Sequence, residues 1–257
     1  MAEIGNSVLD WLTNRRAMRL WRREARNAAA IAVAKLRRER AEARKLRHQL
    51  NEFIAAADYR LALPMIGATT FPKPYGTEWS WRPMLWREPL AVAGMASVES
   101  NTRLGEELTL FHDCRYSELS LRQVRNQRAA DLAPFGLRMD VFNFDGSFLS
   151  VVLDLPDAAA DGLKRAHLIR VDTIVEMEKP LEIFARLNIK HGPNTEQIVR
   201  ELPLHDDVVM VEFDLAYSQL NEKRVERAWV DLIFENPQMS QVTVRDLTFS
   251  RRPRAEF

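Results

Sequence analysis

The sequence has a single cysteine, Cys114, among its 257 residues. One cysteine excludes an internal disulfide framework and a cysteine-based zinc site, and it suits a reducing compartment. Long apolar runs are also missing, because no stretch approaches the roughly 18 residues that a membrane-spanning helix needs. The apolar run at 28–34 continues directly into KLRRER without a cleavage site of small residues, so it does not match a signal peptide. We therefore expect a cytoplasmic protein, with peripheral contact to the inner membrane as an alternative.

Recognisable catalytic and nucleotide-binding motifs are missing as well. The sequence holds no P-loop, dinucleotide-binding fingerprint, G-x-S-x-G elbow or H-E-x-x-H helix. Its five histidines show no paired metal-ligand spacing. We predict no enzyme, no cofactor and no metal site. A hydrolase that pairs Cys114 with His112 stays open as an alternative. A calcium site made by loop carboxylates is a second one, with Asp206 and Asp207, or Glu235 and Asp246, as its candidates.

Charge is unevenly distributed along the chain. The whole sequence has 37 Lys and Arg against 36 Asp and Glu, a net charge of +1. Residues 1–60 hold 14 basic and 7 acidic residues and carry +7, so by difference the remainder carries −6. Proline is absent from Val8 to Ala57, where Ala, Arg, Leu and Glu dominate. Because all four favour helices, residues 1–60 are predicted to form a basic arm built on one long α-helix. Such asymmetry indicates an arm with its own partner.

An apolar seam runs along the second half of this arm. Positions spaced alternately by four and three residues are mostly Ala or Leu, and the larger ones are Leu36, Leu46, Leu50 and Phe53. Heptad spacing is typical of a coiled coil, so these residues are predicted to mediate oligomerisation. Packing on the protein's own body or on a partner protein is the alternative, because alanine-rich seams bury little area per residue.

The first half of the arm mixes tryptophan and arginine. This pattern is typical of an amphipathic helix on an anionic membrane surface, and the residues concerned are Trp11, Arg15, Arg16, Arg19, Trp21, Arg22 and Arg23. A basic helix alone lacks a motif that reads nucleic acid, which argues against a nucleic-acid partner.

Residues 61–103 form a proline- and tryptophan-rich connecting segment. Five prolines between positions 64 and 89 exclude a continuous helix. Trp79 and Trp81 lie in EWSWRPMLW, which also contains Trp86. Dense aromatics in an irregular segment either fasten it to a sheet or form a platform for a ligand, and both interpretations stay open.

From residue 104 to 257 the hydrophobic pattern has a period of two. In LIRVDTIVEM, alternate residues from Ile169 to Met177 are predicted to point inwards, and in LEIFARLNIK those from Leu181 to Ile189. About nine such segments separated by turn residues indicate an antiparallel β-sandwich of the jelly-roll type. HGPN at 191–194 lies between two of them, so it is predicted to be a hairpin turn. The predicted fold class is mainly β, a sandwich preceded by a long N-terminal helix.

The outward positions of two neighbouring segments are rich in polar side chains. If these segments pair as a hairpin, their outward residues share one face that could bind sugar hydroxyls. Cross-strand charge pairs without a ligand are the alternative. The candidate ligand-binding residues are Arg170, Asp172, Glu176, Glu182, Phe184, Arg186, Asn188 and Lys190, together with Trp79 and Trp81.

Two resemblances add to this interpretation. The succession VMVEFDLAYS, ERAWVDLIFENP and QVTVRDLTFSRR resembles the closing strands of galactose-binding-like jelly rolls. That resemblance implies a non-catalytic binding module, often for carbohydrate. The chain is also similar to a bacterial family of uncharacterised proteins, through TRLGEELTLFHDC, FNFDGSFLSVVLDLP and EMEKPLEIFARLNIKHGPNTEQ. We predict a β-sandwich that presents a polar face to a glycan. A structural protein that works through its helical arm is the alternative.

Overall fold

The computed structural model describes residues 7–62, 70–128, 130–204 and 208–254. The chain divides into two compact units, Met1–Ile54 and Ala55–Phe257. We call the first the helical unit and the second the body.

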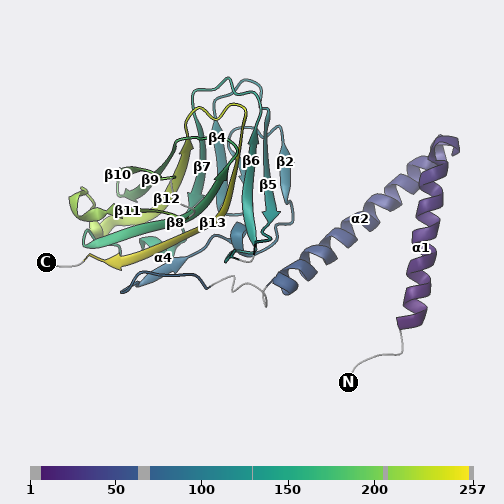
Figure 1. The fold of residues 1–257 in the computed structure, drawn as a ribbon, viewed down its shortest axis with the longest axis horizontal. Coiled ribbons are helices and arrows are strands. Elements are labelled where there is room, and N and C mark those ends of the chain that lie inside the picture. The colour runs from purple at the N-terminus through teal and green to yellow at the C-terminus, as the bar shows by residue number, and fades with distance from the viewer. Residues whose placement is uncertain (1–6, 63–69, 129, 205–207, 255–257) are drawn as a thin grey trace. The chain divides into compact units, whose positions relative to one another are not determined.

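The helical unit consists of helices, as the sequence predicts (Figure 1). Helix α1 spans Ser7–Asn27, a short 3-10 turn follows at Ala28–Ala30, and α2 spans Val33–Ala62. The arm is therefore two helices, because Ile31 takes an extended conformation with φ −80° and ψ 137°. Ile31 is β-branched, which lowers its helix propensity slightly. No helix in the described residues is long and apolar enough to cross a bilayer.

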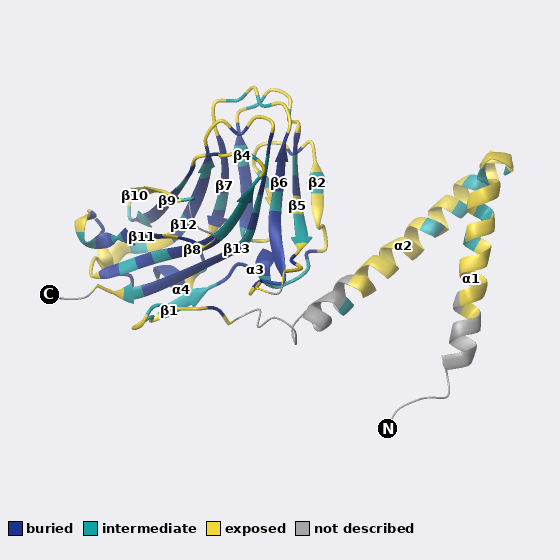
Figure 2. Cartoon of the chain, viewed as in Figure 1, coloured by how far each residue is buried: buried dark blue, intermediate teal, exposed yellow. Residues whose placement is uncertain are grey.

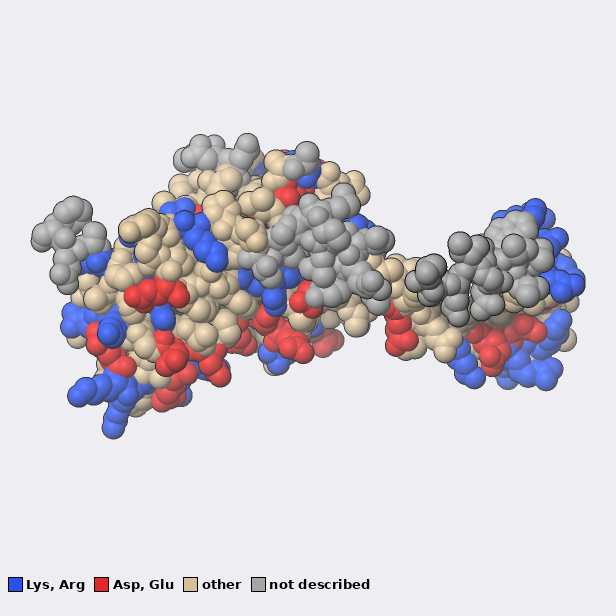
Figure 3. All heavy atoms as spheres, turned by 90° about the horizontal axis from the view of Figure 1, so that it is seen from below, with Lys and Arg blue, Asp and Glu red and all other residues tan. Residues whose placement is uncertain are grey.

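The side chains of this unit are largely exposed (Figure 2). Leu46 is 38%, Leu50 51% and Phe53 71% exposed, and Leu36 is half-buried. Lys and Arg side chains gather on the same unit (Figure 3). The predicted seam is thus an uncovered apolar stripe on a basic pair of helices.

The body contains two antiparallel sheets, which we call sheet A and sheet B (Figure 1). The order in sheet A is β11 (Val209–Asp214), β8 (His167–Met177), β13 (Ser240–Pro253), β6 (Phe135–Val141), β5 (Leu119–Arg125) and β2 (Gly94–Ala96), and β1 (Trp79–Trp81) also pairs with β13. The order in sheet B is β10 (Asn194–Glu201), β9 (Ile183–His191), β12 (Val225–Phe234), β7 (Leu149–Asp154), β4 (Leu108–His112) and β3 (Thr102–Leu104). Short helices α3 (Met84–Arg87) and α4 (Asp157–Ala160) complete the body.

The core lies between the two sheets and follows the predicted alternation. On β8, Ile169, Val171 and Thr173 are each at most 2% exposed, and on β9 Ile183 through Ile189 are buried at every second position. Burying such alternate aliphatic side chains contributes about 1.5–3 kcal/mol each. The predicted fold class, an antiparallel β-sandwich with an N-terminal helical arm, is confirmed.

One pairing expectation is wrong, because β8 and β9 do not form a hairpin. β8 pairs with β11 and β13 in sheet A, whereas β9 pairs with β10 and β12 in sheet B. The bend at Lys179-Pro180 therefore carries the chain from one sheet to the other. Crossings between sheets are common in sandwiches of this kind. The predicted turn at 191–194 is a hairpin, with Asn194 opposite His191 and Gly192 at φ 59°.

The segment 70–103 is part of the body. Trp86 is 0% exposed, and its Nε1 donates to the carbonyl of Val244 at 2.9 Å. Trp81 lies 5.6 Å from Phe249, ring centroid to centroid, and both Trp81 and Trp79 are half-buried against the core. The tryptophans therefore fasten this segment to sheet A.

The same segment contributes a buried ion pair. Arg82 donates from Nε to Oδ1 of Asp246 at 2.9 Å and from Nη2 to Oδ2 at 2.7 Å. The Arg82 side chain is 0% exposed and the Asp246 side chain 11%. Burial raises the pKa of Asp246, and the neighbouring Arg82 opposes that rise. The two residues, 164 positions apart in sequence, join the connecting segment to the last strand.

Arg82→Ala is expected to lower the free energy of unfolding by about 3–5 kcal/mol, because it leaves Asp246 buried without its partner. The double variant Arg82→Met/Asp246→Leu should recover most of that loss. Arg122→Ala is the control: Arg122 pairs with Asp140 while 49% of its side chain is exposed, and such pairs contribute about 0–1 kcal/mol. Urea titration measures the free energy of unfolding of the two single variants and the double variant. Equal losses for Arg82→Ala and Arg122→Ala would contradict the role of the buried pair.

Candidate functional site

The outer face of sheet B carries a groove of about 600 Å3. Five neighbouring strands and the loops at their ends contribute to it. Its lining residues are Asn101, Arg103, Thr109, Phe111, Phe148, Ser150, Val152, Asp154, Arg186, Arg227, Trp229 and Asp231. We call it the sheet B groove.

Strand register arranges these side chains in rows. Asp231 on β12 lies opposite Val152 on β7 and Arg186 on β9. Val152 in turn lies opposite Thr109 on β4. Because outward positions on a strand recur every second residue, Trp229 and Arg227 follow Asp231 along the same face of β12. The groove therefore runs across the strands and along β12.

A network of polar side chains forms the centre of the groove floor. Arg186 donates to Oδ2 of Asp231 from Nε at 2.7 Å and from Nη2 at 2.5 Å. Asn188 donates from Nδ2 to the same oxygen at 3.1 Å and accepts from Gln197 through Oδ1 at 2.9 Å. Asn188 is 1% exposed and Asp231 2%. The network holds the Asp231 carboxylate in one orientation.

The second oxygen of that carboxylate has no partner. Oδ1 of Asp231 is buried and accepts no hydrogen bond. A buried polar atom without a partner costs about 1–3 kcal/mol, and such atoms in native proteins call for an explanation. The oxygen is also closed to solvent, so a donor from outside the chain could reach it only if a neighbouring side chain moved.

Aromatic side chains lie at both ends of the groove. Trp229 is half-buried, and the guanidinium carbon of Arg227 lies 4.9 Å from its ring centroid. Phe148 is 45% exposed and Phe111 is half-buried. Carboxylate and guanidinium groups for hydroxyls, beside aromatic faces for apolar ring surfaces, suit an amphipathic polyhydroxyl ligand.

The structure places five of the eight residues predicted for the polar face on β9 or just before it. Arg186 lines the groove, Asn188 lies buried beside it, and Glu182, Phe184 and Lys190 belong to the same strand or its approach. Lys190 pairs with Glu226 at 3.6 Å. The other three, Arg170, Asp172 and Glu176, lie on β8 in sheet A. The two groups therefore do not share a face, because β8 and β9 are in different sheets.

The predicted residues of sheet A are engaged in ion pairs within the body. Arg170 donates to Asp172 at 2.6–3.0 Å, and this hydrogen bond raises the pKa of the Arg170 guanidinium. Glu176 contacts Arg128 at 2.6 Å and Arg245 at 3.2 Å. Trp79 and Trp81 lie on β1 and line neither this pair nor the sheet B groove. Charge pairing within the sheet, the stated alternative, describes these residues.

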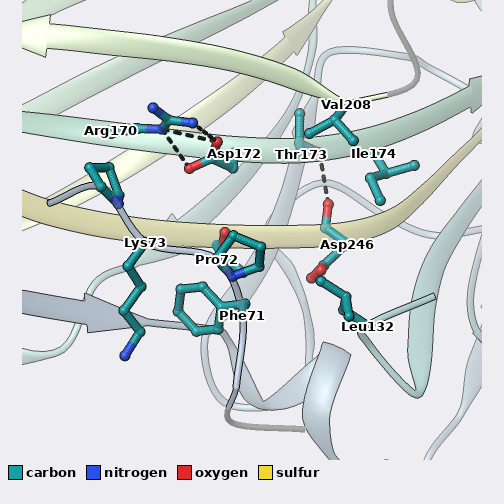
Figure 4. Close-up of a pocket in the computed structure, with 12 residues that line it drawn as sticks. Phe71, Pro72, Lys73, Leu132, Arg170, Asp172, Thr173, Ile174, Val208 and Asp246 are labelled. Carbon is teal, nitrogen blue, oxygen red and sulfur yellow. Dashed lines mark hydrogen bonds and ion pairs between the residues drawn. The ribbon is translucent and has the colours of Figure 1, made fainter. Parts of the chain in front are cut away.

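A second, smaller cavity of about 280 Å3 lies beside Arg170 and Asp172 (Figure 4). Segment 71–74 and Leu132 face it from one side, and Thr173, Ile174 and Asp246 from sheet A. Its carboxylates are already engaged, since Asp172 pairs with Arg170 and both oxygens of Asp246 accept from Arg82. Among the described residues, Lys73 contacts only the Phe71 ring, 5.2 Å from Nζ to the centroid. Thr173 donates to the carbonyl of Asp246 at 2.8 Å. The polar groups of this cavity therefore serve the fold.

Several groove residues were not predicted from the sequence. Trp229, Asp231 and Arg227 lie in ERAWVDLIF, and Phe111 and Phe148 in two other segments. A signal was available, because Ala228, Val230 and Leu232 alternate as buried residues and leave Trp229 and Asp231 outward. Which strands would lie beside β12 could not be inferred from that alternation.

The candidate residues for a hydrolase or a calcium site have structural roles where the structure describes them. Nδ1 of His112 accepts from the backbone N–H of Cys114 at 3.1 Å, and Nε2 contacts the carbonyl of Val98 at 2.9 Å. Burial raises the pKa of the Cys114 thiol, which reduces the thiolate that a nucleophile needs. In the calcium alternative, Asp246 is engaged by Arg82, and Asp206 and Asp207 lie outside the described residues. Among the described residues no group of three metal-ligating side chains occurs.

Arg186→Ala is expected to lower the free energy of unfolding by about 1–3 kcal/mol, because it removes two hydrogen bonds to a buried carboxylate. Arg227→Ala should change it by no more than about 0.5 kcal/mol, because Arg227 is exposed. Chemical denaturation of both variants measures the difference. If Arg227→Ala destabilises the protein as much as Arg186→Ala, then Arg186 does not stabilise the groove floor more than the exposed Arg227 stabilises its rim.

Comparison with known proteins gives a family and distant folds. A model described as a family of unknown function, DUF6478, matches residues 1–257. No curated protein matches. The family 11 carbohydrate-binding module of Clostridium thermocellum, solved with a β-1,3-1,4-mixed-linked tetrasaccharide, is 13% identical, with 65% of this chain and 99% of that chain covered and a TM-score of 0.39.

Two further solved structures are similar at the same level. The C-terminal family 22 carbohydrate-binding module of Clostridium thermocellum Xyn10B is 6% identical, with 73% of this chain and 100% of that chain covered and a TM-score of 0.39. Tailspike protein 4 of bacteriophage CBA120 is 6% identical, with 62% and 21% covered and a TM-score of 0.41. At these TM-scores the likenesses carry no argument about ligand or activity.

Proposed function

The chain belongs to the DUF6478 family of unknown function, and we propose from the geometry of its groove that it is a non-catalytic binding module for a carbohydrate-like ligand. The observation that carries the proposal is the buried, unpartnered Oδ1 of Asp231 on the groove floor. A sugar hydroxyl donates one hydrogen bond and would satisfy that oxygen once a neighbouring side chain of the groove moves to expose it. A site built to hydrogen-bond a hydroxyl discriminates strongly against ligands that lack one.

The surroundings of Asp231 favour the same class of ligand. Its carboxylate is fixed by Arg186 and Asn188, so little ordering cost remains to be met on binding. Trp229 on one side and Phe111 with Phe148 on the other offer apolar faces to the C–H faces of sugar rings. Glu182, Phe184 and Lys190, on β9 or just before it, extend the polar surface beyond the groove.

Asp231→Asn is the sharpest test of this site. The amide oxygen can still accept from Arg186, while the amide nitrogen replaces the free acceptor with a donor. We expect full-length protein to be retained on at least one member of a panel of immobilised oligosaccharides, and Asp231→Asn to weaken that retention by about tenfold or more. Trp229→Ala should weaken it as well.

Asp172→Asn is the matched control, because Asp172 is also the carboxylate of an Arg–Asp pair, on sheet A. It should leave retention unchanged. Absence of retention on every member at millimolar concentrations, or equal effects of the two Asn variants, would overturn the proposed site.

The helical unit supports a second candidate function, self-association or attachment to a partner protein. The observation that favours it is the exposed apolar stripe of Leu46, Leu50 and Phe53 on α2. Exposed side chains of this size at heptad spacing gain stability when they pack in a coiled coil. Self-association or binding of a partner protein through this stripe stays a prediction.

Leu50→Glu/Phe53→Glu should shift the full-length protein towards monomer, because two charges would enter the seam. Arg37→Glu/Arg44→Glu, on another face of α2, is the control and should leave the subunit number unchanged. Sedimentation equilibrium measures the subunit number of the wild-type protein and of both variants. A monomeric wild-type protein, or the same shift in both variants, would exclude self-association through this seam.

Contact of α1 with an anionic membrane stays a prediction, as does the cytoplasmic location. Met18 is 66% and Leu20 47% exposed between exposed arginines at 15, 16, 19, 22 and 23. Trp21 is half-buried, and the side chain of Trp11 lies outside the described residues. Each basic residue near an anionic surface would contribute about 1 kcal/mol.

A further inference from the structure

The sheet B groove has one cation more than its own carboxylates neutralise. Three arginines (Arg103, Arg186 and Arg227) and two aspartates (Asp154 and Asp231) line it, which leaves a net charge of +1. Arg186 pairs with Asp231 at 2.5 Å, and Arg103 lies 3.7 Å from Asp154. Outside the lining, Lys190 and Glu226 pair at 3.6 Å and add no net charge.

Arg227 is the cation left over. Within the described part of the chain its recorded contact is with the ring of Trp229, 4.9 Å from the guanidinium carbon to the centroid. Arg227 has no ion pair there, although it is exposed at the rim of the groove. An unpaired guanidinium at a ligand groove leaves its charge available to the ligand.

The contact with Trp229 also positions Arg227. A guanidinium over an aromatic ring gains cation–π attraction and is restrained by it. Among the described residues the guanidinium makes no hydrogen bond and no ion pair, so its N–H donors remain free. A carboxylate can accept two parallel hydrogen bonds from them.

Arg227 and Asp231 lie on the same face of β12 with Trp229 between them. Successive outward positions on a strand are roughly 6.5–7 Å apart. Arg227 and Asp231 are two such steps apart, roughly 13 Å between Cα atoms, which is more than the length of one sugar ring. A single chain of linked sugars can meet both side chains. A carboxylate of this chain would lie at Arg227, and a hydroxyl of another of its units would donate to Oδ1 of Asp231.

We propose that the ligand of the sheet B groove is an acidic glycan, an oligosaccharide that contains uronic acid units. This inference rests on the proposed function and specifies its ligand class. The uronate carboxylate pairs with Arg227, and a hydroxyl group of another sugar in the same chain satisfies Asp231. Binding involves no covalent step.

Matched ligands test the inference. An oligogalacturonide and the same oligosaccharide with each carboxylate reduced to a primary alcohol differ only in the charged group. Isothermal titration of full-length protein should show the acid form binding about tenfold more tightly, or more, than the reduced form. The preference should shrink as salt is raised, because the attraction of an exposed charge is screened.

Arg227→Gln should abolish the preference for the acid form, and Arg227→Lys should keep part of it, because lysine retains the charge without the planar fork. Arg200→Gln is the control, since Arg200 is an exposed arginine of β10 outside the lining. It should leave both affinities unchanged.

Each contrary result has a distinct meaning. Equal affinity for the acid and reduced forms, or a preference that survives in Arg227→Gln, overturns the acidic ligand and leaves the glycan site standing. Tighter binding of both forms to Arg227→Gln overturns it too, because Arg227 would then be covering Trp229. If the wild-type protein binds neither this pair nor any neutral glycan of the panel, the proposed function falls with the inference.

Discussion

The packing of the two inner sheet faces determines where every outward side chain of the body lies. On β12, Val230 is 0% and Leu232 2% exposed because they fill the space between the sheets. Since successive side chains of a strand point to opposite faces, Trp229 and Asp231 must then face outwards. A shift of one residue would bury the indole and the carboxylate in the core and expose two aliphatic side chains. The core therefore fixes which side chains face the groove, and contacts among these side chains then orient Asp231 and Arg227.

Alternation explains how much of the fold could be predicted. The strands that carry long alternating runs, such as β8, β9, β12 and β13, were located from the sequence, and so was the turn at 191–194. Four strands were missed. β1, β2 and β3 have three residues each, too few for a period to appear, and β5 has seven residues but buries only Leu119 and Leu121. The alternating pattern of a strand does not reveal which other strands pair with it. A bend such as Lys179-Pro180 has the same local chemistry whether it closes a hairpin or crosses between sheets.

In the candidate site, too, the outward residues of a strand could be predicted, whereas their neighbours on other strands could not. Arg186 and Asn188 were predicted as outward polar residues of β9, and both belong to the groove floor or its support. Arg170 and Asp172 were predicted by the same rule but lie on the other sheet. Asp231 was missed, because its importance comes from Arg186, 45 residues away in sequence. A residue that matters through a cross-strand partner becomes visible only when the strand order is known.

Two buried Arg–Asp pairs, one in each sheet, differ in how the two oxygens of the carboxylate are satisfied. Asp246 in sheet A receives Arg82 on both oxygens, and its Oδ1 also accepts from the N–H of Leu247 at 2.8 Å. Asp231 in sheet B receives Arg186 and Asn188 on Oδ2 alone, and its Oδ1 accepts nothing. Satisfying both oxygens of a buried carboxylate favours stability, whereas leaving one free costs about 1–3 kcal/mol in the unliganded protein. In the proposed site, a ligand hydroxyl that donates to Oδ1 would recover that cost on binding.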